Sequence, residues 1–138
     1  MIDKQTLDSI QQKVWTLGRA IGAPINLLIV RWQASGYGEP YIDLDNDGFH
    51  YIISERGMEM SRRTVVSLDE LLYLLLEDAV SAMAWDYERE HRVKGRDPRR
   101  IAFPERIRLM SQLDPRWDAR AMEDIDETLK SSPYFDDP

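Results

Sequence analysis

The chain of 138 residues contains no cysteine and only two histidines, His50 and His91. The absence of cysteine excludes disulfide bonds, thiolate metal ligands and cysteine nucleophiles, and it is typical of a protein in a reducing compartment. Long hydrophobic runs are missing too, because the apolar run at residues 25–32 is far shorter than the roughly 20 residues that span a bilayer. The polar N-terminal residues show no signal peptide. We therefore expect a soluble, cytoplasmic protein with no membrane partner.

An excess of basic residues is also absent. The chain has 25 acidic and 18 basic residues and a formal net charge of -7 at pH 7. Free nucleic acid is therefore excluded as the expected ligand, since such binding normally needs a basic face. The acidity is strongest over residues 115–138, and an acidic surface either keeps the protein in solution or steers a basic partner toward it.

The spacing of apolar residues predicts one α+β domain over residues 1–138. A first helix is expected over residues 3–21, where an apolar stripe advances in steps of three and four before Gly22 and Pro24 end it. Residues 25–66 favour an antiparallel meander of three or four strands, at 25–32, 41–44, 49–54 and 58–65, with turns at 45–48 and 55–57. Two shorter C-terminal helices are expected to begin near Pro104 and at Asp114-Pro115.

A long central helix over residues 67–92 is the best-defined element of the sequence. Ser67 and Glu70 form a capping box at its start. Its apolar face is expected to be buried and to contain Leu72, Leu75, Leu76, Ala79, Val80, Met83, Ala84 and Tyr87. Because no reactive group interrupts this face, the helix is interpreted as structural rather than catalytic.

Two patterns resemble metal sites without completing them. Asp43, Asp45 and Asp47 match the first half of a calcium-binding EF-hand loop, but the twelfth position is Ser54 rather than glutamate, and the flanks favour strands. Glu88 and His91 have a di-iron spacing, but the further carboxylates and the second such pair are lacking. We therefore expect no metal and no cofactor, and we interpret the first pattern as a hairpin turn.

Catalysis is the main alternative function at this point. His50 or His91 would serve as a general base beside a carboxylate in a small soluble enzyme. The nucleophile-elbow, dinucleotide-binding and phosphate-binding glycine motifs are all absent. A concave pocket that holds a histidine and an acid within hydrogen-bond reach would favour the enzyme. A non-catalytic adaptor domain remains a further alternative.

A set of short motifs gives the chain a family resemblance. In order along the sequence, they are Pro40-Tyr-Ile42, Phe49-His-Tyr51, Glu55-Arg-Gly57, Asp69-Glu-Leu-Leu-Tyr73, Met83-Ala84, Tyr87-Glu88, His91-Arg92, Asp97 with Arg99-Arg100 and Phe103, and Leu113-Asp114 with Trp117. Over residues 15–135 this pattern resembles immunity protein family 63 of bacterial polymorphic toxin systems. The resemblance implies a non-enzymatic protein that binds and neutralises a cognate toxin domain during competition between bacteria.

The shared motifs are expected to maintain the fold rather than to contact the toxin. This structural set comprises Glu55, Arg56, Gly57, Glu88, His91, Arg92, Arg99 and Arg100, with arginines 96, 99 and 100 pairing with acids such as Glu88, Glu90 or Glu55. The toxin contacts are expected among acidic and aromatic residues outside the motifs, namely Asp43, Asp45, Asp47, Glu123, Asp126, Glu127, Trp32 and Tyr37.

Overall fold

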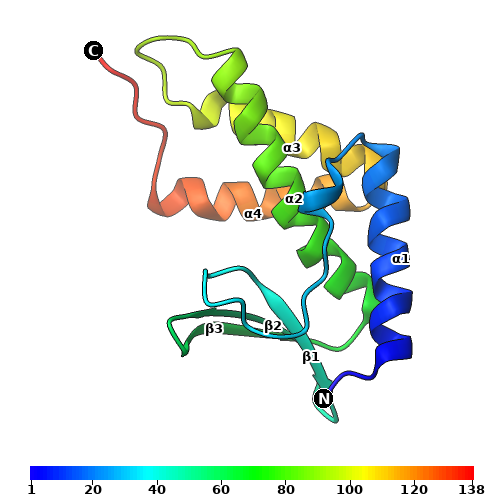
Figure 1. Cartoon of the computed structure of the whole chain (residues 1–138). Helices are drawn as coiled ribbons and strands as arrows, with labels where there is room; N and C mark the ends of the chain where they lie inside the picture. The colour runs from blue at the N-terminus through cyan, green and yellow to red at the C-terminus, as the bar shows by residue number, and fades with distance from the viewer.

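The computed structural model describes all 138 residues and confirms the predicted fold class (Figure 1). An N-terminal helix is followed by a three-stranded antiparallel meander, a long helix and two C-terminal helices. In chain order the elements are α1 (Lys4–Ala20), a 3-10 turn (Ile25–Leu27), β1 (Tyr41–Asp45), β2 (Gly48–Glu55), β3 (Met58–Val65), α2 (Leu68–Glu90), α3 (Arg99–Leu113) and α4 (Trp117–Ser131).

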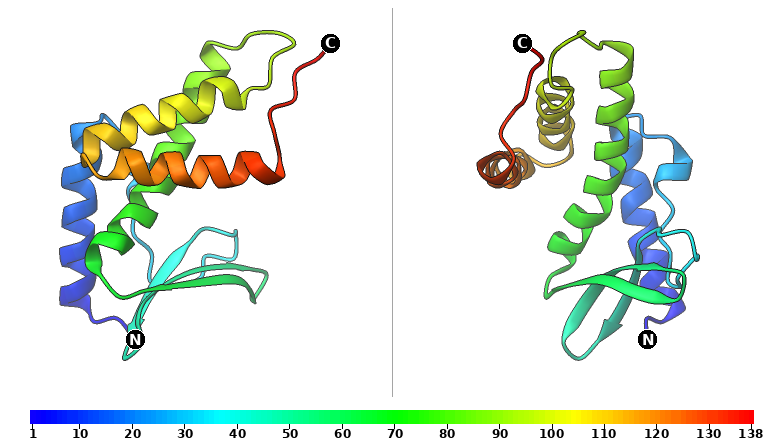
Figure 2. Two further views of the ribbon diagram at one scale, coloured as in Figure 1. Left: turned by 180° about the vertical axis from the view of Figure 1, so that it is seen from behind. Right: turned by 90° about the vertical axis from the view of Figure 1, so that its left-hand side faces the viewer.

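The helices form a layer that covers one face of the sheet. Figure 2 shows α2 running through the middle of this layer, with α1 on one side and the α3–α4 pair on the other. The main hydrophobic cluster joins α1, α2, α3 and the first turn of α4 to residues of β1 and β3. No helix is long and apolar enough to cross a membrane.

The strand predicted at residues 25–32 is wrong. These residues form the 3-10 turn and an irregular segment, although Leu28 and Val30 are buried as a strand interior would be. Gln11 of α1 explains the difference: its side-chain amide donates to Leu28 O at 2.6 Å and accepts from Val30 N at 2.8 Å. The amide satisfies the buried backbone groups that a neighbouring strand would otherwise have to pair.

Two tight turns set the register of the sheet, in the order β1-β2-β3. Asp45 pairs with Gly48 at the first turn, and Glu55 pairs with Met58 at the second. Gly48 has a φ of 129°, and a Cβ there would lie 2.5 Å from Val65 O, so no other residue fits without strain. Arg56 and Gly57 both have positive φ, as a two-residue hairpin turn requires.

The central helix begins at its predicted cap, where the Ser67 side chain accepts a hydrogen bond from Glu70 N. Its predicted apolar face is only partly right. Leu75 is half-buried and Tyr87 is exposed, whereas Leu71 and Tyr73 are fully buried. The reason is that α2 is packed between α1 and α3 and also meets the sheet, so its contacts extend around more than one side.

The third helix begins at Arg99, five residues before the predicted start at Pro104. The Asp97 side chain accepts a hydrogen bond from Arg99 N, just as the Asp114 side chain accepts one from Arg116 N before α4. Both helices thus begin after the same Asp-Pro pair. Pro104 lies in the second turn of α3, where it cannot donate the helical hydrogen bond to the carbonyl of Arg100.

Candidate partner-binding surface

The acids of the first hairpin turn are held mainly by the chain itself. Asp43 Oδ1 accepts hydrogen bonds from Ile2 N at 3.0 Å and from Leu44 N at 2.9 Å. Asp45 Oδ1 accepts from Asp47 N at 2.8 Å and so closes the turn. The Asp47 carboxylate makes no such contact and is exposed. The turn therefore presents one free acid to a partner rather than three.

His50 is buried in the outer face of the sheet beside this turn. Thr64 Oγ1 lies 2.7 Å from Nδ1 of the ring, and Asp45 Oδ1 lies 2.8 Å from Nε2. The contact between Nε2 and Asp45 does not have the geometry of a hydrogen bond. The histidine, together with backbone hydrogen bonds, lowers the pKa of Asp45. An acid is thus within reach of a histidine, but only 4% of His50 is exposed, so a substrate has no access to the imidazole.

The second histidine lies at the C-terminal end of α2 without a carboxylate partner. His91 stacks on Tyr87 with ring centroids 4.0 Å apart, and its Nδ1 lies 2.8 Å from Tyr87 O. Glu88 is fully buried and instead receives two hydrogen bonds from Arg92, at 2.8 and 3.1 Å. These residues close the end of their own helix.

Arg99 and Arg100, which follow α2, bind the C-terminal segment of the chain. Arg99 binds Asp97 through Nε and Nη2 and donates to the carbonyls of Ser132 and Pro133. The Arg99 guanidinium, with help from Phe135 N, holds the pKa of Asp97 well below its usual range. Arg100 pairs with Asp136 at 3.0 Å. The carboxylates used are thus Asp97 and Asp136, and not the expected Glu55, Glu88 or Glu90.

The two aromatic candidates lie near the other end of the sheet. Tyr37 forms a backbone bridge with Glu55, next to the turn at Arg56 and Gly57. Its side chain is 88% exposed, and that of Trp32 is 53% exposed. About seven strand residues, or roughly 23 Å, separate this end of β2 from the turn that carries Asp47. The hairpin acids and the aromatic residues therefore do not form one patch.

The three candidate acids of α4 lie on the outer face of the helix. Trp117, Ala121 and Ile125 face the core. At 3.6 residues per turn, Glu123, Asp126 and Glu127 fall within about 100° of one another on the face opposite Ala121, while Asp124 lies beside the core face. Asp124 accepts a hydrogen bond from the Tyr73 hydroxyl of α2 at 2.9 Å, which directs this flank of α4 toward α2.

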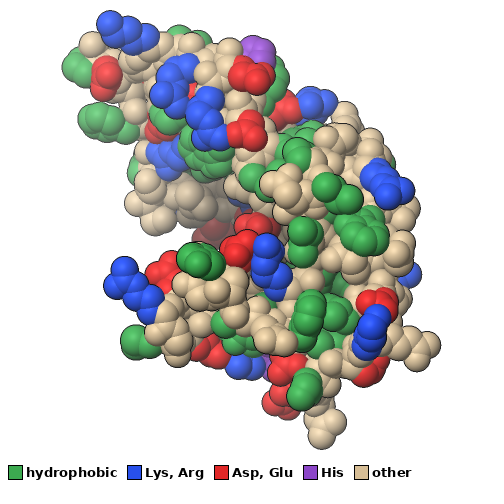
Figure 3. All heavy atoms as spheres, viewed as in Figure 1, with side chains coloured by type: hydrophobic (Ala, Val, Ile, Leu, Met, Phe, Trp, Pro, Cys, Tyr) green, Lys and Arg blue, Asp and Glu red, His purple; other side chains and the backbone are tan.

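A cleft separates the sheet from this flank of the helical layer. Figure 3 shows it as a hollow on the left of the view, with acidic side chains at its back. Its floor is a cavity of about 340 Å³ between β2, β3 and α2, lined by Tyr51, Ile53, Ser61, Arg63, Leu74, Glu77, Asp78 and Ser81. A second cavity, of about 130 Å³, shares Tyr51 and Asp78 with the first and extends toward α1 and Glu39.

Most charges around the cleft have a partner within the chain. Glu77 pairs with Arg106 of α3, and Glu39 pairs with Arg31 at 2.6 Å. The Arg120 guanidinium lies over the Tyr73 ring, 3.9 Å from its centroid. Burial raises the pKa of Glu77 despite its arginine partner. The cleft is thus a polar site in which Glu39 and Glu77 are paired within the chain and Asp78 is exposed.

The sequence reasoning missed the cleft residues. Glu77 and Asp78 interrupt the apolar run of the central helix, and this charged pair is the one signal in the sequence that could have indicated a site there. Tyr51 gave no signal, since an aromatic residue in a strand is ordinary. What brings Tyr51 to Asp78 is the angle at which α2 crosses the sheet, and local patterns do not encode that angle.

Comparison with protein families adds the decisive observation. The family model described as Immunity protein 63 matches residues 45–127, well over half of the chain. The chain belongs to this family. The match begins at the first hairpin turn and ends on α4, so it covers β2, β3, α2 and α3 and leaves out α1. No curated protein and no solved structure matches the chain. An immunity protein has a protein partner, the toxin against which it protects.

Proposed function

We propose that this Immunity protein 63 member binds a cognate bacterial toxin domain and neutralises it by occluding the toxin's active or substrate-binding surface. The observation that carries the proposal is the family match over residues 45–127. Residues 1–138 act as one unit in the cytoplasm, and no catalytic step is required of them. The buried His50 and the isolated His91 support inhibition by contact rather than by turnover.

The cleft and its rim are the proposed docking surface. The α4 flank carries Glu123 and Glu127, and the loop with the exposed Tyr37 borders the cleft through Glu39. Exposed aromatic residues are frequent binding anchors. Of the other expected contacts, Trp32 lies near the same loop, Asp126 lies beside Glu123 on the exposed face of α4, and Asp47 is free in its turn. Asp43 and Asp45 contribute at most to the long-range field.

The charge of the chain supports association with a basic surface. Toxins that act on nucleic acids have basic clefts, and an inhibitor with a net charge of -7 would be attracted to such a cleft before contact. This attraction raises the association rate, and it weakens as salt screens the charges. Affinity itself would come from the few groups that become buried on docking.

The proposal is tested by expressing the product of the gene immediately upstream in a host that lacks both proteins. We expect growth arrest that is relieved when this chain is co-expressed, and we expect the two proteins to purify together. Persistent arrest with both proteins present would contradict the proposal. Binding without relief would instead favour the adaptor.

A titration distinguishes occlusion from catalysis. An occluding inhibitor must be present in at least one equivalent, so toxin activity should fall linearly and reach zero near equimolar amounts. An enzyme would inactivate the toxin at far lower ratios, given time. Loss of toxin activity at one-hundredth of an equivalent would therefore replace occlusion with a catalytic function.

A further inference from the structure

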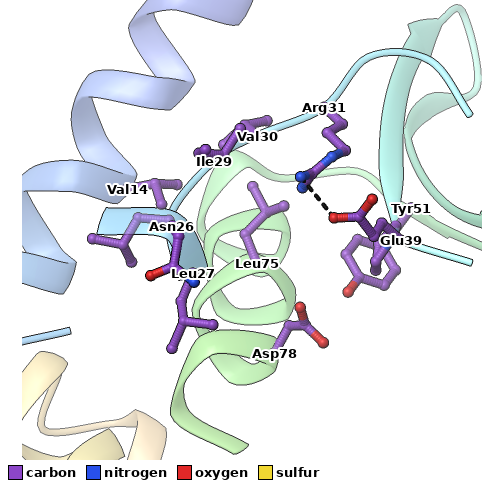
Figure 4. A pocket seen from close by; sticks show the side chains of 12 residues that line it. Val14, Asn26, Leu27, Ile29, Val30, Arg31, Glu39, Tyr51, Leu75 and Asp78 are labelled. Carbon is purple, nitrogen blue, oxygen red and sulfur yellow. Dashed lines mark ion pairs between the residues drawn. The ribbon is translucent and has the colours of Figure 1, made fainter. Parts of the chain in front are cut away.

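The two cavities of the cleft meet at Tyr51 and Asp78. Figure 4 shows the carboxylate of Asp78 on α2 and the hydroxyl of Tyr51 on β2 projecting toward the same space, beyond the Arg31–Glu39 ion pair. Both polar groups line both cavities. The site therefore lies where the sheet and the helical layer separate, and it is open to a group that enters from the cleft.

Neither group has a partner within the chain. Glu77 and Glu39, the other two acids that line the cavities, each form an ion pair with an arginine. Asp78 forms no ion pair and no hydrogen bond; burial raises its pKa, opposed only by the more distant charge of Arg31. Burial and the charges of Asp78 and Glu77 also raise the pKa of Tyr51. The Asp78 side chain is exposed in the cleft, where a group from outside the chain can reach it.

The acceptor groups of Asp78 and Tyr51 favour binding of a cationic group. Glu39 is paired with Arg31 and Glu77 with Arg106, and the charge of Arg63 acts on Glu77, so Asp78 is the one acid in the lining of the two cavities without an arginine paired to it. A carboxylate and a phenol oxygen both accept hydrogen bonds, and an ammonium or guanidinium group donates several. A metal ion is disfavoured, because no group of three or more suitable ligands converges.

We propose that the toxin inserts an arginine or lysine side chain into the cleft, where Asp78 is its counter-ion and the Tyr51 hydroxyl a second acceptor. The inference rests on toxin neutralisation and names the chemistry of its contact. The apolar lining from Ile53 and Leu74 would pack against the aliphatic part of the entering side chain, which keeps its charged end directed at Asp78. Glu123 and Glu127 at the rim would attract the toxin before docking, and Asp78 would form an ion pair with the inserted side chain after docking.

The test measures the dissociation constant of the complex with the upstream gene product for the wild type, Asp78→Asn and Glu90→Gln. Glu90 is the matched control, since it is exposed, lies on the same helix and is about 18 Å away along the helix axis. We expect Asp78→Asn to weaken binding at least tenfold, mainly through a faster dissociation rate, and Glu90→Gln to change it less than twofold. Tyr51→Phe should give a smaller loss than Asp78→Asn.

Stability measurements separate binding from folding. Because Asp78 has no partner in the free protein, Asp78→Asn should leave the melting temperature unchanged or raise it. Weakened binding together with unchanged stability supports the proposal. Wild-type affinity for Asp78→Asn would overturn it and leave toxin neutralisation intact. Absence of binding by the wild-type chain would overturn both, so the two failures are distinguishable.

Discussion

Two neighbouring leucines of α2 give a direct stability test of the open cleft. Leu76 is fully buried in the hydrophobic cluster, whereas Leu75 is half-buried and lines the cavity of about 130 Å³. The same substitution at adjacent positions of one helix has the same effect on helix propensity. The difference between Leu76→Ala and Leu75→Ala therefore reports on packing alone.

The structure sets the size of that difference. Replacing a fully buried leucine by alanine costs about 2–5 kcal/mol, because the cavity that remains is only partly refilled. Leu75 loses less contact area and leaves no new enclosed cavity, so about 1–1.5 kcal/mol is expected from roughly half the transfer free energy of a leucine side chain. The sequence alone predicted the higher cost for Leu75, because its position indicated a buried face.

Urea unfolding followed by tryptophan fluorescence measures both values. With a slope of about 2 kcal/mol per molar urea, Leu76→Ala should lower the midpoint by about 1–2.5 M and Leu75→Ala by less than about 0.8 M. Equal slopes for the three proteins are the control that the unfolding reaction is unchanged. Equal losses for the two variants would mean that Leu75 is enclosed and that the smaller cavity of the cleft is closed in solution.

Three further outcomes follow from the packing and the charges. Gly18→Ala in α1 should lower the melting temperature, because a Cβ there would lie 2.4 Å from a Leu28 methyl group. The cost of overpacking, about 1–3 kcal/mol, exceeds the gain in helix propensity of about 1 kcal/mol. A higher melting temperature would show that Leu28 moves aside. Asp97→Asn should destabilise the protein at pH 7 by about 3 kcal/mol, since it breaks a buried pair with Arg99. The pKa of Asp97 is lowered in the folded state, so this stabilisation is fully present above the unfolded pKa of about 4 and is lost progressively as pH falls from there through the lower folded pKa. The urea midpoints of wild type and variant should converge over that acid range, and a constant gap would refute the assignment. Asp47→Lys should slow association with the toxin and reduce its salt dependence in stopped-flow measurements, with no change in the melting temperature; an unchanged rate would exclude a steering role for this turn.

Local chemistry in the sequence predicted most of the elements. The Ser67 cap, the glycine-containing turns and the apolar stripe of α4 each depend on residues within a few positions of one another. The start of α3 is also encoded in the sequence, by the same Asp-Pro pair that precedes α4, although Pro104 indicates a later start.

What the sequence did not predict depends on contacts between distant residues. Residues 25–32 have strand composition, yet Gln11 satisfies their backbone from another helix. The arginines after α2 have many candidate acids, and only the path of the C-terminal segment selects Asp136. The cleft needs α2, the sheet and α4 placed together, and no spacing along the chain specifies that arrangement.

Hydrogen–deuterium exchange of the chain, free and bound to the upstream gene product, tests the central claim most directly. The account predicts slower exchange in the complex over residues 51–63, 73–81 and 120–127, which surround the cleft, and no change over α1 away from it. Protection confined to α1, or no protection anywhere, would contradict docking of a toxin at this surface.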